Sequence, residues 1–129
     1  MATIKLGNPP KNFKAQVKFK LLDGGEAVIE FVFTYRTRSQ FGAFLDEIHA
    51  ETGALKPGDD GDQSNLLEKA YQAGVKFSAS QLMRAAEGWN LDVPFNEETV
   101  AELCDEYPAA SAAALDAYRV AITEGRLGN

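Results

Sequence analysis

Few residues of this chain are of the types that carry out chemistry at an enzyme active site. Its 129 residues include one histidine, His49, and one cysteine, Cys104. A cysteine nucleophile needs a base beside it and a further group that orients the base. Both residues fall at ordinary positions of amphipathic helices, so we interpret His49 as a partly exposed side chain near a helix end and Cys104 as a core residue. The sequence therefore predicts no catalytic residues.

The acidic segment 59–62 (DDGD) has the composition of a cation-binding loop but not its spacing. An EF-hand loop needs Asp at its first position when Gly occupies the sixth. If Gly61 is the sixth residue, Lys56 is the first, and if Gly58 is the sixth, Gly53 is the first. One histidine and one cysteine cannot form a structural zinc cluster either. We expect the segment to be a solvated turn, and the protein to bind no metal and no cofactor.

Phosphate-binding and acid–base motifs are also missing. The turn Asp23-Gly24-Gly25 lacks the spaced glycines and the Lys-Ser/Thr pair of a P-loop, and it joins two predicted strands rather than opening a helix. The adjacent carboxylates Glu97-Glu98 and Asp105-Glu106 are predicted to be helix-end and surface groups. A small enzyme is the least favoured function, and a deep pocket that holds His49 together with several acids would be its signature.

Composition and charge exclude several other classes of protein. The chain is 45% apolar and 25% charged, and its length fits a single domain over residues 1–129. No apolar run approaches the roughly 18 residues of a membrane span, and the first ten residues lack a signal-peptide core. The net charge is −6, which disfavours nucleic acid as a partner. Residues 1–40 are nonetheless basic, so they could contact the acidic remainder of a neighbouring copy.

The first third of the chain predicts an antiparallel β-hairpin over residues 12–36. Apolar and polar residues alternate from Lys14 to Leu21 and again from Glu26 to Tyr35, which is typical of strands with one buried face. Asp23-Gly24-Gly25 between them supplies residues that accept the positive φ of a tight turn. An isolated hairpin is marginally stable in water, so its phenylalanine-rich face must pack on another element.

Helical periodicity dominates the rest, which makes the fold class α+β with four to five helices. We expect a helix over residues 39–52 capped by Ser39, a flexible acidic loop over residues 53–65, and a helical part over residues 66–125. The boundaries predicted inside the helical part are a stop at Gly74, starts at Ser78, Asn96 and Pro108, and stops at Gly88 and Gly125. A third, edge strand is a further candidate between Val75 and Phe77.

Two regions carry apolar residues that could serve a partner rather than the core. The only tryptophan, Trp89, lies in a predicted connection between two helices, where it either fills the core or anchors a partner. The alanine-rich helix after Pro108 presents a smooth face that could pack within the chain, on another copy or on a helical partner. The candidate partner-binding residues are Trp89, Leu115, Tyr118 and Ile122.

Short segments along nearly the whole chain, in a fixed order, resemble the phage tail assembly chaperone family. They are residues 5–13 (KLGNPPKNF), 35–41 (YRTRSQF), 88–91 (GWNL), 95–96 (FN), 107–108 (YP), 117–118 (AY) and 125–129 (GRLGN). The specificity of the resemblance comes from the order of these segments. Segment 53–65 has no counterpart in it, and the family offers no catalytic motif.

The resemblance implies a non-enzymatic role in the assembly of long-tailed phages or prophages. Members of this family are thought to bind the long, largely helical tape-measure protein before tail-tube subunits polymerise around it. It also implies a location in the host bacterial cytoplasm and absence from the mature virion, with self-association and the tail-tube protein as further candidate contacts. The main alternative is a structural tail or head–tail component that stays in the virion.

Overall fold

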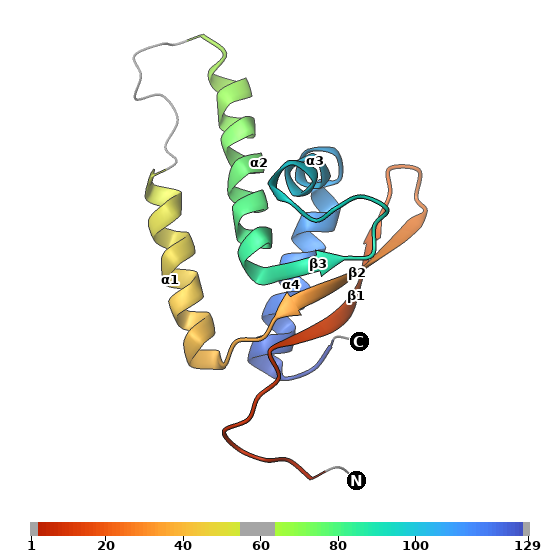
Figure 1. The fold of residues 1–129 in the computed structure, drawn as a ribbon. Coiled ribbons are helices and arrows are strands. Elements are labelled where there is room, and N and C mark those ends of the chain that lie inside the picture. The colour runs from red at the N-terminus through yellow and green to blue at the C-terminus, as the bar shows by residue number, and fades with distance from the viewer. Residues whose placement is uncertain (1–2, 55–63, 128–129) are drawn as a thin grey trace.

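The computed structural model describes residues 3–54 and 64–127 and shows an α+β fold (Figure 1). Three strands form one antiparallel sheet in the order β1-β2-β3, and helices supply the other layer. The elements are β1 (Asn12–Lys20), β2 (Glu26–Thr34), α1 (Arg38–Ala54), α2 (Leu66–Ala85), β3 (Ala86–Trp89), α3 (Glu97–Glu106) and α4 (Pro108–Glu124). Most of the predicted loop 53–65, including the acidic segment 59–62, lies outside the described residues.

The predicted hairpin is confirmed, with β1 and β2 paired from Asn12 opposite Thr34 to Lys20 opposite Glu26. Its turn closes where the Gly24 N–H donates to the Leu21 carbonyl at 3.0 Å. Gly24 has φ +91°, a conformation that side chains with a Cβ rarely adopt. The Asp23 carboxylate accepts a bond of 2.8 Å from the Gly25 N–H. The local residue types therefore determine this turn.

The third strand exists, but its predicted position between Val75 and Phe77 was wrong. It is β3, at Ala86–Trp89, and it pairs antiparallel with β2. Ala86 lies opposite Phe33 and Gly88 opposite Val32, so Glu87 is an extra residue in a β-bulge. Its carboxylate accepts a bond of 3.0 Å from the Asn12 amide nitrogen on β1. Four residues with a bulge carry no alternating pattern, which is why the sequence did not reveal this strand.

Residues 75–77 are helical because α2 is one continuous helix rather than two. Neither the predicted stop at Gly74 nor the predicted start at Ser78 occurs. A glycine inside a helix costs about 1 kcal/mol relative to alanine. The second half of α2 buries Ala79, Leu82 and Ala85 in the core, and that burial outweighs the local cost. The helix ends before Gly88, because Ala86 already adopts extended backbone.

The other helix ends follow local capping signals. Helix α1 begins at Arg38 rather than at Ser39, because Thr37 and Gln40 exchange reciprocal side-chain-to-backbone hydrogen bonds of 3.2 and 2.9 Å. The predicted Asn96 cap is confirmed: its side chain accepts from the Thr99 N–H at 3.0 Å. Pro108 opens α4, and Gly125 ends it with φ +70°.

The core lies between the sheet and the helices. Alternate residues of β1 and β2 are buried, and α4 crosses behind the strands in the view of Figure 1. The two most buried residues of the sheet are Phe31 and Phe33. On the other face β1 carries exposed lysines, as the alternation predicted.

Tyr118 on α4 is the centre of this core and is 1% exposed. Its ring centroid lies 5.2 to 6.2 Å from the rings of four phenylalanines from β1, β2 and α1, namely Phe13, Phe33, Phe41 and Phe44. Its hydroxyl donates to the Thr34 carbonyl at 2.8 Å and accepts from the Arg36 guanidinium at 2.8 Å. Arg36 also donates to the Arg84 carbonyl at 3.1 Å and lies 4.4 Å from the Phe44 ring. Tyr118, together with its partner Arg36, thereby connects the sheet, α1, α4 and the end of α2.

Replacing Tyr118 by phenylalanine should therefore destabilise the protein although it keeps the ring. Tyr118→Phe leaves the Thr34 carbonyl and the Arg36 guanidinium without this partner, and we expect a loss of about 1–3 kcal/mol in the free energy of unfolding. Denaturant titration measures it. Tyr71→Phe is the matched control, because Tyr71 is 78% exposed, and it should change stability little. Equal stability of the two variants would contradict this role of the Tyr118 hydroxyl.

Stability should also fall at alkaline pH, in part through Tyr118. Burial raises the pKa of Tyr118 above its ordinary value of 10.0, and the Arg36 guanidinium offsets part of that rise. The folded state therefore holds this proton more tightly than the unfolded state, so its contribution is complete below pH 10.0 and is lost as pH rises through the folded-state pKa. Unfolding free energies measured above pH 10.0 should decline more steeply for the wild type than for Tyr118→Phe. Parallel declines would refute the assignment.

Candidate partner-binding surfaces

His49 and Cys104, the residues that could have served as base and nucleophile, do not form a pair. His49 is exposed on α1, whereas Cys104 on α3 is 5% exposed. Burial raises the pKa of the Cys104 thiol, and a hydrogen bond with Ser111 offsets part of that rise. A raised pKa keeps the thiol protonated, which is the reverse of what a cysteine nucleophile needs. Cys104 is therefore a core residue, as the sequence predicted.

The described part of the chain gives no sign of a metal centre. Within residues 3–54 and 64–127, no three or more His, Cys, Asp or Glu side chains gather closely enough to hold a metal ion. A hollow between α1, α2 and α3 is edged by Glu51, Glu97 and Glu98, but His49 does not line it. None of the helices in the described ranges combines the length and apolarity that a bilayer crossing requires.

Trp89 lies in the connection between α2 and α3, as predicted, where it is the last residue of β3 and is half-buried. Its ring packs edge-on against Phe31, with centroids 6.2 Å apart, and against Phe95 at 5.0 Å. The indole N–H donates to the Val93 carbonyl at 2.9 Å. These contacts fix the segment after β3 onto the sheet. Trp89 thus has a structural role, while its exposed part leaves it a candidate for partner contact.

The three candidates on α4 have different surroundings. Tyr118 and Ile122 are 1% and 7% exposed, so both face the core. Ala110 and Ala114 are fully buried as well, which places one side of the alanine-rich helix within the chain's own core. Leu115 is half-buried and borders a hollow on the surface. A partner can reach Leu115 without disturbing the fold, whereas Tyr118 and Ile122 are accessible only if the core opens.

The hollow beside Leu115 is a shallow groove of about 340 Å³ between α2 and α4, which we call the α2–α4 groove. Its lining is small or apolar and comprises Ala70, Tyr71, Gly74, Val75, Ser78, Cys104, Pro108, Ser111, Ala112 and Leu115. On its α2 side, Tyr71 and the neighbouring Leu67 are each 78% exposed. The sequence did not reveal either residue as a candidate for partner contact, because their helical spacing is also that of a core-facing stripe.

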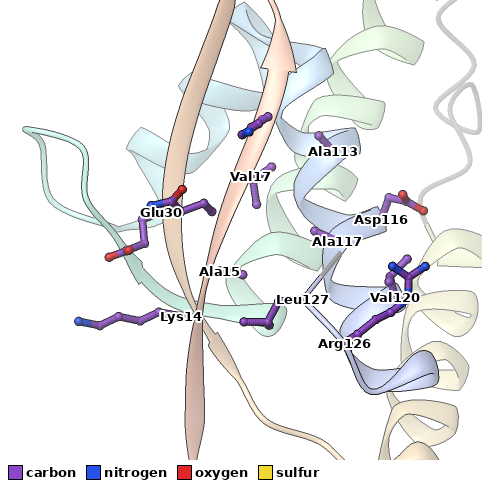
Figure 2. Close-up of a pocket in the computed structure, with 12 residues that line it drawn as sticks. Lys14, Ala15, Val17, Glu30, Ala113, Asp116, Ala117, Val120, Arg126 and Leu127 are labelled. Atoms are coloured by element: carbon purple, nitrogen blue, oxygen red, sulfur yellow. The ribbon is translucent and has the colours of Figure 1, made fainter. Parts of the chain in front are cut away.

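A second groove, of about 610 Å³, runs between β1 and α4 (Figure 2). We call it the edge groove, because β1 is an outer strand of the sheet. It is lined by Lys14, Ala15, Gln16, Val17, Lys18, Glu30, Ala113, Asp116, Ala117, Val120, Arg126 and Leu127. Figure 2 shows the small side chains of Ala113 and Ala117 on the α4 wall, opposite β1. The α2–α4 groove is lined by small or apolar side chains, whereas the lining of the edge groove also includes the charged residues Lys14, Lys18, Glu30, Asp116 and Arg126.

Comparison with known proteins assigns the chain to a family. The family model described as phage tail assembly chaperone matches residues 1–129, the whole chain. Searches among curated proteins and among solved structures gave no match. The match agrees with the resemblance in the sequence. The chain belongs to the phage tail assembly chaperone family.

Proposed function

We propose that this protein is a non-enzymatic chaperone that binds the tape-measure protein and keeps it soluble while the tail is assembled. Family membership carries the tail-assembly role. The proposal adds a partner and a surface: a helix of the tape-measure protein lies in the α2–α4 groove. It also places the protein in the host cytoplasm and outside the finished particle.

Exposed apolar residues beside the groove are the observation that supports this surface. Leu66, Leu67 and Tyr71 are 40%, 78% and 78% exposed on the first half of α2. A contiguous apolar patch on a folded protein commonly marks an interaction site. Across the groove, Pro108, Ala112 and Leu115 supply a second apolar wall.

The lining of the groove suits a helix. Ala70, Gly74 and Ser78 recur every four residues along α2, so small side chains lie on one side of the helix toward the groove. An amphipathic helix can lay its apolar face into such a groove. The larger side chains of Tyr71 and Leu115 would then pack against the two sides of the bound helix. The net charge of −6 would help to keep such a complex dissolved.

Co-expression with the tape-measure protein from the same gene cluster tests the proposal. We expect the tape-measure protein to be soluble and to co-purify with the wild-type chain. Leu67→Glu and Tyr71→Glu place a charge on the apolar wall, where it would be desolvated by the partner, and each should reduce co-purification at least about tenfold, equivalent to about 1.4 kcal/mol. Circular dichroism should show unchanged folding, because both side chains are largely exposed.

Leu22→Glu is the matched control. Leu22 is a fully exposed leucine at the hairpin turn; it borders a separate hollow beside Pro108 and does not line the α2–α4 groove. This variant should co-purify like the wild type. A tape-measure protein that is equally soluble alone and never co-purifies would refute the proposal, and equal losses for Leu22→Glu and Tyr71→Glu would refute the surface. Recovery of the chain from purified virions would favour a structural tail component instead.

A further inference from the structure

We infer that the edge groove receives residues 3–6 of a second copy of this chain, which add to β1 as a fourth strand. This inference concerns contacts between copies and does not depend on the tape-measure protein. It rests on three features: an open strand edge, small side chains on α4 beside it, and an exposed apolar arm at residues 3–11.

In the part of the chain that the structure describes, no strand pairs with the edge of β1 that faces the groove. The Tyr35 N–H donates to the Lys11 carbonyl and the Leu21 N–H donates to the Gly25 carbonyl, so the odd-numbered residues of β1 bond to β2. In an antiparallel ladder the alternate residues point their N–H and C=O groups the other way. Those of Lys14, Gln16 and Lys18 therefore point toward the edge groove. An open strand edge of this kind is a template for a further strand.

Helix α4 leaves room beneath such a strand. Ala113, Ala117 and Val120 line the groove and are only half-buried, while Ala110 and Ala114 one turn away are covered by the chain itself. Small residues on the α4 wall leave space for larger apolar side chains from an added strand. Leu127 borders the same groove and is 59% exposed. Helix α4 therefore leaves room for one further strand beside β1.

The arm has the pattern that this space requires. Ile4 and Leu6 are 81% and 92% exposed, and they alternate with Thr3 and Lys5, so an extended arm presents both apolar side chains on one face. Two large apolar side chains on one face of the arm form an exposed apolar patch of the kind that marks interaction sites. Facing the α4 wall, Ile4 and Leu6 would be buried while Lys5 stays on the solvated face of the sheet.

The occupant is a second copy rather than the chain's own arm. Pro9 and Pro10 favour an extended backbone immediately before β1, and the bend in the arm is the turn at Leu6-Gly7, where Gly7 has φ +83°. Figure 1 shows residues 3–11 running away from the sheet and the helices. An arm held away from its own body by a stiff pair of prolines is positioned to reach a neighbour, as in exchange of an identical element between protomers.

The charges of Lys5 on the arm and of the lysines on β1 favour one register for the added strand. Lys5 opposite Lys14 or Lys18 would place like charges across the ladder, which is unfavourable. Lys5 opposite Gln16 has neither lysine directly across from it, and Glu30 lies across from Gln16 on β2 with a compensating negative charge. In that register Ile4 and Leu6 lie beside Ala15 and Val17, both of which are buried. Pairing of two β1 strands around Gln16 would instead set Lys14 against Lys18 of the other copy, so the edge disfavours that dimer.

Crosslinking between differently marked copies tests the inference. In a Cys104→Ala background, one protein carries Leu6→Cys and another carries Ala117→Cys. Mixing the two and adding a short bifunctional maleimide should produce a heterodimer in which the two marked residues are joined. No such product, or a crosslink that forms only when both cysteines are in one chain, would overturn the inference.

Assembly in solution gives a second readout with matched controls. Light scattering over a range of concentrations should show at least a doubling of mass for the wild type, and a monomer for Ile4→Glu/Leu6→Glu. The Leu22→Glu variant introduces the same charge at an exposed leucine outside the edge groove, and it should assemble like the wild type. Replacing Ala117→Cys by Leu22→Cys should abolish the crosslink to Leu6→Cys. A wild type that is monomeric throughout, or an unchanged assembly of the double variant, would contradict the inference.

Discussion

The buried hydroxyl of Tyr118 joins parts of the molecule that are far apart in the sequence. It donates to the Thr34 carbonyl at the end of β2 and accepts from Arg36, which in turn donates to the Arg84 carbonyl near the end of α2. Buried polar groups are costly without partners, and here the hydroxyl, the guanidinium and the two carbonyls serve as partners for one another. The rings of Phe33, Phe41 and Phe44 surround the Tyr118 ring, while the Arg36–Arg84 end of the network is exposed. The orientation of α1, α2 and α4 against the sheet depends on this contact.

The aromatic core contacts the second half of α2, and the first half of α2 is more exposed to solvent. The second half of α2 is held in the core by Leu82 and Ala85, whereas Leu67 and Tyr71 on its first half are exposed. The molecule therefore combines a closely packed aromatic centre with exposed apolar residues on the first half of α2. A chaperone that holds an apolar helical partner needs both properties, because its own fold must persist while its apolar side chains remain available.

The parts of the fold that local residue types determine were predictable from the sequence. The turn at Asp23-Gly24, the cap at Asn96 and the start at Pro108 each satisfy backbone groups with nearby residues. Strand β3 and the continuity of α2 were not predictable, because pairing with β2 and burial of Leu82 are tertiary effects.

The candidate surface was predictable only in part, for the same reason. Leu115 and Tyr118 belong to one helical stripe in the sequence, but the fold buries Tyr118 and leaves Leu115 beside a groove. Tyr71 was missed because apolar helical spacing alone does not show which end of a helix is covered. The contact of Trp89, Leu115, Tyr118 and Ile122 with a partner stays a prediction.

Hydrogen–deuterium exchange of the chain with and without the tape-measure protein is the most direct test of the central claim. Exchange reports local opening, and the first half of α2 has few buried side chains to resist it. We expect the partner to slow exchange in residues 66–78 and 108–115, which border the α2–α4 groove. Unchanged exchange in both segments while the complex is present, with protection confined to other parts of the chain, would contradict the account.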